Sequence, residues 1–436
     1  MKHIGLESSP THNIAGPEGS HSQSTMNFGS CRFCGSILRT LFCDLGVSPL
    51  SNAYLTVKQL DQMEPHYPLR AYICENCFLG QVQAFESPEN IFGDYAYCSS
   101  YSDSWLQHAK TFATYACERF ALTPSSFVVE VASNDGYLLK FFKEAGVPIL
   151  GIEPAANIAR MAQAIGIPTY VKFFGEQTAR ALAAEGKQAD LLVGNNVLAH
   201  VPDLNDFVNG LEILLKPEGV LSMEFPHMLS IIQKNQFDTI YHEHFSYFSL
   251  ATVQRVFDAH GLEIFDVEQL STHGGSLRIL AKHKGQKRHP IKPSVSSLIA
   301  LEKREGLQSV DTYKRFDDQT KKTKRALLEF LIKAKDEGKS IAGYGAPAKG
   351  NTLLNYCGIR TDLLDYTVDR SPQKQGCFLP GTHIPIYSPD KLRETKPDLV
   401  LILPWNIQDE IISQWKEIRN WGGQFLIPIP SVKLVK

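Results

Sequence analysis

The pattern of apolar and polar positions changes along the chain and divides it into segments. From about residue 29 to 98 the apolar runs are short and broken by turn residues, which indicates a small irregular domain. From about residue 101 a helical stretch at 104–120 is followed by apolar runs that alternate with amphipathic segments. This alternation predicts a parallel sheet with helices on both faces. The expected strands are 127–131, 148–152, 190–194 and 219–225, with an antiparallel strand at 276–282.

The same alternation returns near the end of the chain, after a break. Residues 284–293 are basic and weakly apolar, which suits a linker, and a long charged helical region is expected at 295–337. Expected strands at 340–344, 364–368, 399–403 and 424–427 then predict a second, smaller α/β unit. The predicted organisation is a disordered leader at 1–28 and domains at 29–100, 101–285 and 286–436.

Composition and charge exclude several classes of protein. Hydrophobic residues make up 43% of the chain and charged residues 21%, as in soluble globular proteins. The 44 basic and 46 acidic side chains nearly cancel, so we expect no nucleic-acid partner. No apolar run approaches the roughly 18 residues that span a bilayer, and the polar N-terminus lacks the apolar core of a signal peptide. We expect a cytoplasmic protein without a membrane partner, as a monomer or weak oligomer.

Two Cys-x-x-Cys pairs in the first domain predict a metal site. Zinc takes about four soft ligands in a tetrahedron, and each pair can present two thiolates to one ion. A redox dithiol is disfavoured because neither pair opens a helix after a βαβ strand, while chance pairing and simple burial remain alternatives. We expect one structural zinc ion per chain, bound by Cys31, Cys34, Cys74 and Cys77.

A loop of acidic and small residues follows the first predicted strand of the central domain. Residues 130–136 read Glu-Val-Ala-Ser-Asn-Asp-Gly and precede a helical segment at 137–142. Such a turn brings backbone amides and a helix N-terminus to a cofactor. Although Ala132 stands where glycine is usual, the loop resembles motif I of class I S-adenosylmethionine (SAM) methyltransferases. The Gly-x-Gly-x-x-Gly of a nicotinamide site is absent.

Two later segments support a SAM site. Glu153 ends the next predicted strand, where a carboxylate can accept both ribose hydroxyls, and residues 190–203 resemble the fourth strand of such a methyltransferase with its loop. An ordinary α/β domain with incidental turn residues is the alternative. The expected cofactor-binding residues are Glu130, Ala132, Asn134, Gly136, Glu153, Asn195 and Asn196.

Titratable side chains concentrate in the run Tyr241-His-Glu-His244. Consecutive residues point in different directions, so at most two or three of them can share one cavity. Histidine suits proton removal near neutral pH, and a carboxylate can hold its tautomer. The alternatives are a His-x-His metal pair and an exposed polar loop.

Together these motifs resemble the bacterial sugar 3-C-methyltransferases, which install branched methyl groups on nucleotide-linked deoxysugars. The resemblance covers nearly the whole chain from Cys31 onward. It includes both cysteine pairs and the runs at 95–103, 130–136, 241–249, 273–278 and 343–352. It implies an α/β protein with an N-terminal zinc-binding domain, a central Rossmann-like SAM methyltransferase domain, and a smaller Rossmann-like C-terminal domain that helps to seat the nucleotide sugar.

The resemblance also implies the chemistry. The substrate would be a nucleoside-diphosphate 4-keto-6-deoxyhexose, with dTDP as the expected carrier, methylated at C3 through an enolate. His244 would be the base, with Glu243 and Tyr241 orienting or polarising and Tyr95 or Tyr97 supplying a further phenol. The implied substrate-binding residues are His273, Arg278, Tyr344, Lys349 and Asn351.

Other interpretations of the sequence stay open. The glycine-rich turn at 343–350 could bring Lys349 to a diphosphate, or it could be only a strand–helix connection. A SAM methyltransferase that acts on an oxygen or nitrogen acceptor would need no enolising base. A zinc-containing binding protein with an inactive cofactor fold would need neither SAM nor a base.

Overall fold

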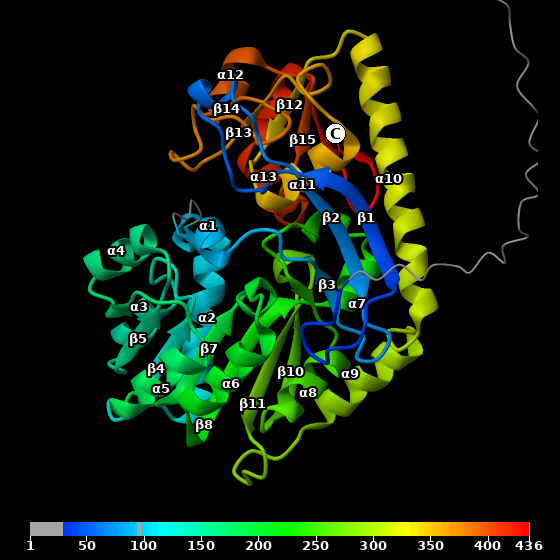
Figure 1. The fold of residues 1–436 in the computed structure, drawn as a ribbon. Helices are drawn as coiled ribbons and strands as arrows, with labels where there is room; N and C mark the ends of the chain where they lie inside the picture. The colour runs from blue at the N-terminus through cyan, green and yellow to red at the C-terminus, as the bar shows by residue number, and fades with distance from the viewer. Residues whose placement is uncertain (1–28, 94–97, 436) are drawn as a thin grey trace, which may run out of the picture.

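The computed structural model describes residues 29–93 and 98–435, and three β-sheets organise this part of the chain (Figure 1). The central sheet has seven strands in the order β10-β11-β8-β7-β4-β5-β6. Its strands are β4 (Val128–Val131), β5 (Ile149–Ile152), β6 (Thr169–Tyr170), β7 (Ala189–Asn195), β8 (Leu215–Pro226), β10 (Leu262–Leu270) and β11 (Ser276–His283).

The central sheet confirms the parallel arrangement that the sequence predicts. β4 pairs in parallel with β5 and β7, and β7 pairs in parallel with β8. β11 is antiparallel to β8, as expected, while β10, which adds a second antiparallel strand at the edge, was not predicted. Antiparallel strands at one edge of a parallel sheet are common in large mixed sheets.

Helices cover both faces of the central sheet because neighbouring residues of its strands point to opposite sides. On β4, Val128 packs into the core beneath α2 and α3, whereas Val129 packs into the core beneath α5, α6 and α8. The bounds of these helices are α2 (Asp103–Phe120), α3 (Leu139–Glu144), α5 (Glu176–Ala184), α6 (Leu204–Leu214) and α8 (Leu250–Ala259). Two further helices are α4 (Ala156–Ala164) and α7 (Met228–Gln233).

The first domain is a small antiparallel sheet that includes a strand from the central segment. Its order is β1-β2-β3-β9, with the last strand contributed by residues far along the chain. The strands are β1 (Thr40–Ser48), β2 (Tyr67–Ile73), β3 (Gly80–Val82) and β9 (Ser246–Tyr247), and the short helix α1 (Pro88–Phe92) follows β3. The run that carries the predicted base is therefore anchored in the first domain.

The C-terminal domain contains the six-stranded sheet β14-β13-β12-β15-β16-β17, parallel except for β17. The strand order reverses between β12 and β15, which makes the crevice at their carboxyl ends a natural ligand site. The strands are β12 (Ile341–Tyr344), β13 (Tyr366–Val368), β14 (Ile386–Tyr387), β15 (Leu399–Ile402), β16 (Gln424–Ile427) and β17 (Lys433–Val435). The helices are α11 (Ala348–Cys357), α12 (Lys391–Thr395) and α13 (Gln408–Gln414).

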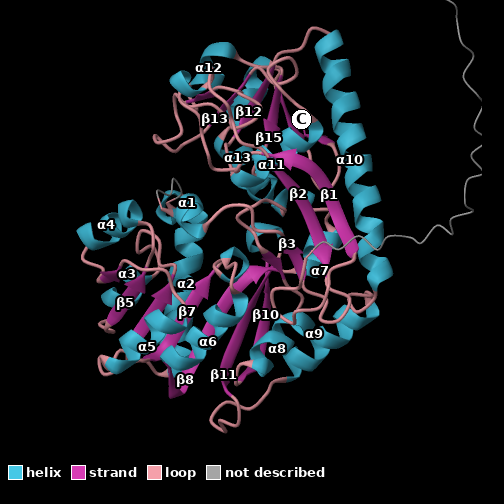
Figure 2. Ribbon diagram, viewed as in Figure 1, coloured by secondary structure: helices cyan, strands magenta, loops and turns pink. Residues whose placement is uncertain are grey.

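The charged helical region predicted at 295–337 is two helices, α9 (Pro293–Arg304) and α10 (Val310–Asp336). Gly306, with φ of +82°, makes the turn between them, a conformation that favours glycine. Figure 2 shows α10 running along one side of the molecule from the central to the C-terminal domain, next to β1. No helix among the described residues is long and apolar enough to cross a membrane.

A buried carboxylate joins α9 to the central domain. Glu302 accepts hydrogen bonds from the amides of Leu250 (2.6 Å) and Ala251 (2.9 Å) at the start of α8. His227 Nε2 lies 2.7 Å from the same carboxylate, and both side chains are buried. The negative charge thus satisfies free amides at a helix N-terminus, where the helix dipole also favours it.

Replacing Glu302 with alanine should destabilise the protein strongly. The change leaves two amides and His227 unpaired in the interior, and an unsatisfied buried polar group costs about 1–3 kcal/mol. Urea unfolding followed by circular dichroism should show an earlier transition for Glu302→Ala. Glu305→Ala, at an exposed position one turn further along, is the control and should unfold like the native protein. Equal midpoints for the two variants would contradict this account of Glu302.

Candidate active site

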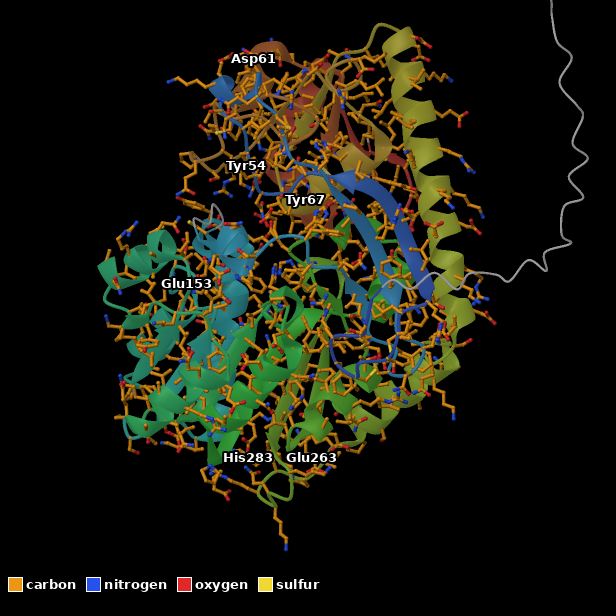
Figure 3. The ribbon with its side chains drawn as sticks, in the orientation of Figure 1. Tyr54, Asp61, Tyr67, Glu153, Glu263 and His283 are labelled. Carbon is orange, nitrogen blue, oxygen red and sulfur yellow. The ribbon has the colours of Figure 1, made fainter. Side chains whose placement is uncertain are left out.

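A cavity of about 970 Å³ lies between the central and C-terminal domains. Its walls include the carboxyl ends of central strands and the β12–β15 crevice of the C-terminal domain, and Asn52 from the first domain also lines it. Figure 3 shows Glu153 on the side of the central domain that faces the C-terminal domain, whereas Glu263 and His283 lie at the opposite end. Parallel α/β sheets bind ligands at such carboxyl ends.

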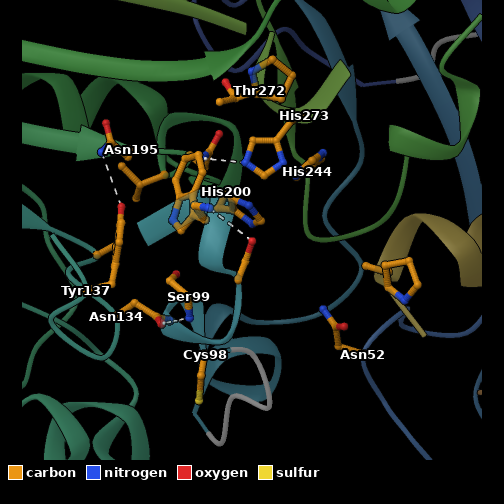
Figure 4. Close-up of a pocket in the computed structure, with 18 of the residues that line it drawn as sticks. Asn52, Cys98, Ser99, Asn134, Tyr137, Asn195, His200, His244, Thr272 and His273 are labelled. Carbon is orange, nitrogen blue, oxygen red and sulfur yellow. Dashed lines mark hydrogen bonds between the residues drawn. The ribbon is translucent and has the colours of Figure 1, made fainter. Parts of the chain in front are cut away.

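The loop after β4 forms one end of the cavity. Both oxygens of Glu153 accept backbone hydrogen bonds, from the amide of Asn134 at 3.0 Å and that of Ala155 at 2.9 Å. Asn134 in turn accepts a hydrogen bond from the amide of Ser99 at 2.8 Å (Figure 4). Burial raises the pKa of Glu153. Glu153 and Asn134 both line the cavity, so the loop and the predicted ribose carboxylate meet there.

Three residues of this loop, Ala132, Asn134 and Gly136, have left-handed backbone conformations. Ala132 has φ of +56° at the position where glycine is usual, and it lines the cavity. Gly136 has φ of +80°, and a Cβ atom there would lie 2.9 Å from the side chain of Ile167. Gly136 therefore permits the turn but does not itself line the cavity. Glu130, which is buried beneath the loop, does not line the cavity either. Burial raises the pKa of Glu130 well above its usual range.

Asn195 and Asn196 extend this end of the cavity from the carboxyl end of β7. Asn195 Nδ2 lies 3.4 Å from the hydroxyl of Tyr137, and Asn196 Nδ2 lies 3.2 Å from His273 Nε2. Both asparagines line the cavity. The backbone amide of Asn196 donates to the carbonyl of Glu224 on β8, which fixes the turn.

The centre of the cavity contains His244. Its Nδ1 lies 2.9 Å from the carbonyl oxygen of Thr239, and its Nε2 lies 2.7 Å from the hydroxyl of Tyr241. A carbonyl can only accept, so Nδ1 carries the proton and Nε2 of the neutral ring holds a lone pair. Burial lowers the pKa of His244 well below its ordinary value, with a further contribution from His200. The imidazole is therefore a neutral base at neutral pH.

Two more histidines surround His244 (Figure 4). The rings of His200 and His244 are 4.6 Å apart and meet edge to face. Burial lowers the pKa of His200 to about 4 and that of His273 to about 4. All three rings are neutral at neutral pH, so they do not repel one another.

The other two members of the predicted run do not line the cavity. Glu243 accepts two hydrogen bonds from Asn52 Nδ2, at 2.7 and 3.0 Å, and its carboxylate thus binds the first domain. His242 Nε2 lies 3.2 Å from the carbonyl of Pro68 in β2, and its ring packs edge-on against Tyr67. Tyr241 and His244 line the cavity, whereas Glu243 and His242 do not.

The predicted substrate residues divide into two groups. His273, Tyr344 and Lys349 line the cavity. Arg278 does not: its guanidinium is buried against Glu224 (3.0 Å) and Glu268 (3.1 Å).

Asn351 also lies outside the cavity lining, since its Nδ2 donates to the carbonyl of Ser51 and holds α11 against the first domain. Asn351 and Arg278 therefore make these hydrogen bonds and ion pairs outside the cavity lining. Tyr95 and Tyr97 lie outside the described residues.

Some residues of the cavity were not singled out from the sequence. His200 belongs to the loop that resembles the fourth-strand region, so its position was a usable signal. Trp105 lines the cavity from α2, where it stacks on His108 and Tyr137 at 5.0 and 5.9 Å between ring centres. No sequence pattern identifies Trp105, because an aromatic residue on an amphipathic helix is usually part of the core.

The four cysteines of the two pairs meet in the first domain. Their sulfur atoms all lie within 4.8 Å of one another, although the pairs are far apart in sequence. Hydrogen bonds between the thiols lower the pKa of Cys31 and raise the pKa values of Cys74 and Cys77. Four thiolates would close the coordination shell of zinc and leave no position for substrate.

Three family models match consecutive parts of the chain. A model described as "Putative zinc binding domain" matches residues 31–92, a "Methyltransferase domain" model matches 105–267, and a "C-methyltransferase C-terminal domain" model matches 271–430. The C-methyltransferase NovU of Streptomyces niveus is 35% identical over 405 residues, which cover 93% of this chain and 96% of NovU.

More distant relatives match only the central part. The ubiquinone biosynthesis O-methyltransferase of Bartonella tribocorum is 26% identical over 95 residues, 22% of this chain and 38% of that protein. Among solved structures, magnesium protoporphyrin IX methyltransferase of Synechocystis with bound SAM is 16% identical. It covers 41% of this chain and 79% of that one, with a TM-score of 0.32.

The fold and the family models define a SAM-dependent methyltransferase of class I with an N-terminal zinc-binding domain. Within that class, the chain belongs to the C-methyltransferase family that includes NovU. This confirms the predicted fold class, the family, and SAM and zinc as cofactors.

Removing one cysteine of the cluster should release the metal. We expect the native protein to contain about one zinc ion per chain and Cys74→Ser to lose most of it, because a hydroxyl binds zinc poorly. Metal analysis after gel filtration measures this. Cys117→Ser, outside the cluster, is the control and should retain zinc. Native zinc content in Cys74→Ser would argue against the four-thiolate site.

Glu153 is predicted to bind the ribose of SAM. Glu153→Ala should weaken SAM binding by about 1–3 kcal/mol, the usual penalty for unpaired polar groups. Calorimetric titration measures the affinity, with Glu144→Ala on the exposed end of α3 as the control. Because Glu153 also holds two loop amides, Glu153→Gln should retain more affinity than the alanine variant. Unchanged affinity in Glu153→Ala would exclude the ribose contact.

Proposed function

We propose that this C-methyltransferase methylates C3 of a nucleoside-diphosphate 4-keto-6-deoxyhexose, with His244 as the base. The observation that carries the proposal is the neutral His244 ring in the cavity. Its Nδ1 is hydrogen-bonded to the carbonyl of Thr239, and its Nε2 faces the hydroxyl of Tyr241. A carbon acceptor must lose a proton before it can attack a methyl group, so C-methylation needs a base. Methylation of an oxygen or nitrogen acceptor depends less on a base in the site.

The hydrogen bonds around His244 suit proton removal. Thr239 holds the proton on Nδ1 and stabilises the imidazolium that forms when Nε2 accepts a second proton. Tyr241 donates to Nε2 in this structure and must leave it when the substrate arrives. The released phenol can then donate a hydrogen bond to the sugar.

The reaction begins at C3 of the sugar. The C3–H bond breaks, the proton goes to His244 Nε2, and the electron pair moves onto the oxygen of the neighbouring C4 carbonyl. Bound SAM supplies the methyl group that C3 receives. Asn134, Glu153, Asn195 and Asn196 would hold the cofactor, since all four side chains line the same end of the cavity.

The size and charge of the cavity support a nucleotide-linked substrate. A volume of about 970 Å³ lies at the upper end of the roughly 300–1,000 Å³ that ligand pockets usually measure. Arg370 lines the cavity from the loop after β13 and is half exposed, 3.7 Å from Asp103 across the cleft. An exposed ion pair of this length is weak, so the guanidinium can turn to a diphosphate instead.

Replacing His244 should abolish proton removal without loss of the cofactor. We expect His244→Asn to lower turnover and C3 deuterium exchange by roughly 10²–10⁴-fold, the usual contribution of a general base. Mass spectrometry with a 4-keto sugar nucleotide measures both, and calorimetry checks SAM binding. His242→Asn is a matched control in the same run, because His242 faces β2 and not the cavity.

The same experiment separates the competing functions. Exchange at the native rate in His244→Asn would assign the base to another residue, with Tyr241, Tyr95 and Tyr97 as the next candidates. If the native protein neither exchanges nor methylates any 4-keto sugar nucleotide, the proposed substrate class is wrong.

A further inference from the structure

Lys349 brings a positive charge into the cavity without an acidic partner in contact. The residue lies in the first turn of α11, after the turn at 345–347 that follows β12. Its Nζ donates to Asn406 Oδ1 at 2.9 Å and lies 4.9 Å from the centre of the Trp405 ring. No carboxylate within residues 29–93 and 98–435 lies within 4.0 Å of this ammonium. It therefore keeps donor hydrogens for a ligand, since an ammonium has three.

The charge of the Lys349 ammonium affects the pKa values of the histidines at the centre of the cavity. Burial is the main cause that lowers the pKa of His273, and the positive charge of Lys349 is the next. At His244 the same charge adds a smaller contribution, after burial, His200 and His273. Burial also lowers the pKa of Lys349 itself, while Asp238 opposes this effect. Lys349, His244 and His273 all line the same cavity, so the ammonium shares the enclosed space that contains the proposed base.

A contact between domains fixes the position of Lys349. Trp405, on which the ammonium rests, donates from Nε1 to the buried carboxylate of Asp238 at 2.6 Å. Asp238 belongs to the 3₁₀ helix η4 (Phe237–Thr239), which also supplies the carbonyl that holds His244.

Gly274 gives Trp405 the space that it needs, since a Cβ atom there would lie 2.7 Å from the indole ring. The C-terminal domain thus holds Lys349 at a fixed position relative to His244, the proposed base in the central domain.

We propose that Lys349 is a catalytic residue that donates a hydrogen bond to the C4 carbonyl oxygen of the substrate and holds the negative charge of the enolate. This inference rests on the proposed function. When the C3–H bond breaks and its proton goes to His244, the bonding electron pair moves to the C4 oxygen beside the Lys349 ammonium. The lysine keeps its protons throughout, and no bond forms between Lys349 and the sugar.

The balance of charges favours this role. Proton transfer turns two neutral groups into an imidazolium and an enolate. A nearby cation stabilises the enolate and destabilises the imidazolium. The net effect is favourable when the ammonium contacts the enolate oxygen directly and the imidazolium lies further away, because the energy varies as 1/r. Fixed donors of this kind in an enclosed site are among the strongest contributors to catalysis.

A diphosphate suits the surroundings of Lys349 less well. A diphosphate spreads its charge over several oxygens and suits a planar fork of donors, whereas Lys349 is a point charge that already donates one hydrogen to Asn406. Arg370 is half exposed, offers a planar fork of donors, and lines the same cavity. We therefore assign the diphosphate to Arg370 and the sugar carbonyl to Lys349.

The test compares two lysine variants on the full-length protein. Lys349→Met removes the charge and keeps the length of the side chain. Lys324→Met is the matched control, because Lys324 also contacts an aromatic ring (Tyr356, 4.5 Å) and a neutral oxygen but does not line the cavity. C3 deuterium exchange of a 4-keto sugar nucleotide, kcat, KM and SAM affinity are measured for both.

We expect Lys349→Met to lower the rate of C3 exchange and kcat by roughly 10²–10³-fold, as for the loss of one oxyanion donor. KM should change by less than about threefold, since the interaction forms mainly in the transition state. SAM affinity should be unchanged, which shows that the variant is folded. Lys324→Met should match the native protein in all four quantities. Added methylammonium should partly restore exchange in Lys349→Ala, an effect that a purely structural role would not produce.

The outcomes that overturn the inference are distinct from those that overturn the function. Raised KM with native kcat in Lys349→Met would place Lys349 at the diphosphate. Native exchange in this variant would remove it from the chemistry. A covalent adduct trapped by borohydride on Lys349 would show a bond to the sugar in place of a hydrogen bond. In all three cases the native protein still methylates the sugar; absence of exchange by the native protein would overturn both proposals.

Discussion

The cavity depends on the packing of three domains, because no single domain contains all its walls. The residues around His244, the predicted base, are held by contacts with both the first and the C-terminal domain. Asn52 of the first domain holds Glu243, and β9, which follows His244 directly, pairs with β3 of that domain. From the other side, Trp405 of the C-terminal domain bonds to Asp238. The short segment from η4 to β9 is therefore constrained at both ends, which positions His244 more rigidly than a surface loop would.

Burial inside these walls also determines the charge of the histidines in the cavity. Three histidines in one cavity would repel one another if they were charged, but desolvation lowers the pKa of each and keeps the rings neutral at neutral pH. A neutral ring with its proton fixed on Nδ1 is a competent base, whereas an imidazolium is not. Among the positive charges that line the cavity, the ammonium of Lys349 comes from the C-terminal domain and rests on Trp405. The arrangement separates the group that takes the proton from the group proposed to hold the resulting negative charge.

Much of the architecture was predictable because it follows from local patterns. Buried parallel strands are short, continuous apolar runs, so β4, β5, β7 and β8 could be located in advance, and β12, β13, β15 and β16 likewise. The edge strands were harder to locate: β14 has two residues and β17 three, and neither produces a clear periodicity. β9 was missed for a different reason. Its two residues form a strand only because β3 of another domain lies beside them.

The sequence by itself determined which chemical groups are available: two pairs of thiols, a cofactor loop after a strand, and a run with two histidines. Chain spacing is enough for these because the groups of each motif are near neighbours in sequence. Only the tertiary structure decided which member of each motif faces the cavity. His242 and His244 are two residues apart, yet one faces β2 and the other Tyr241 and Thr239. Arg278 and Asn351 belong to motifs that resemble the family, but buried partners hold them elsewhere. The physical reason is that side-chain direction and burial depend on long-range packing, which local sequence does not specify.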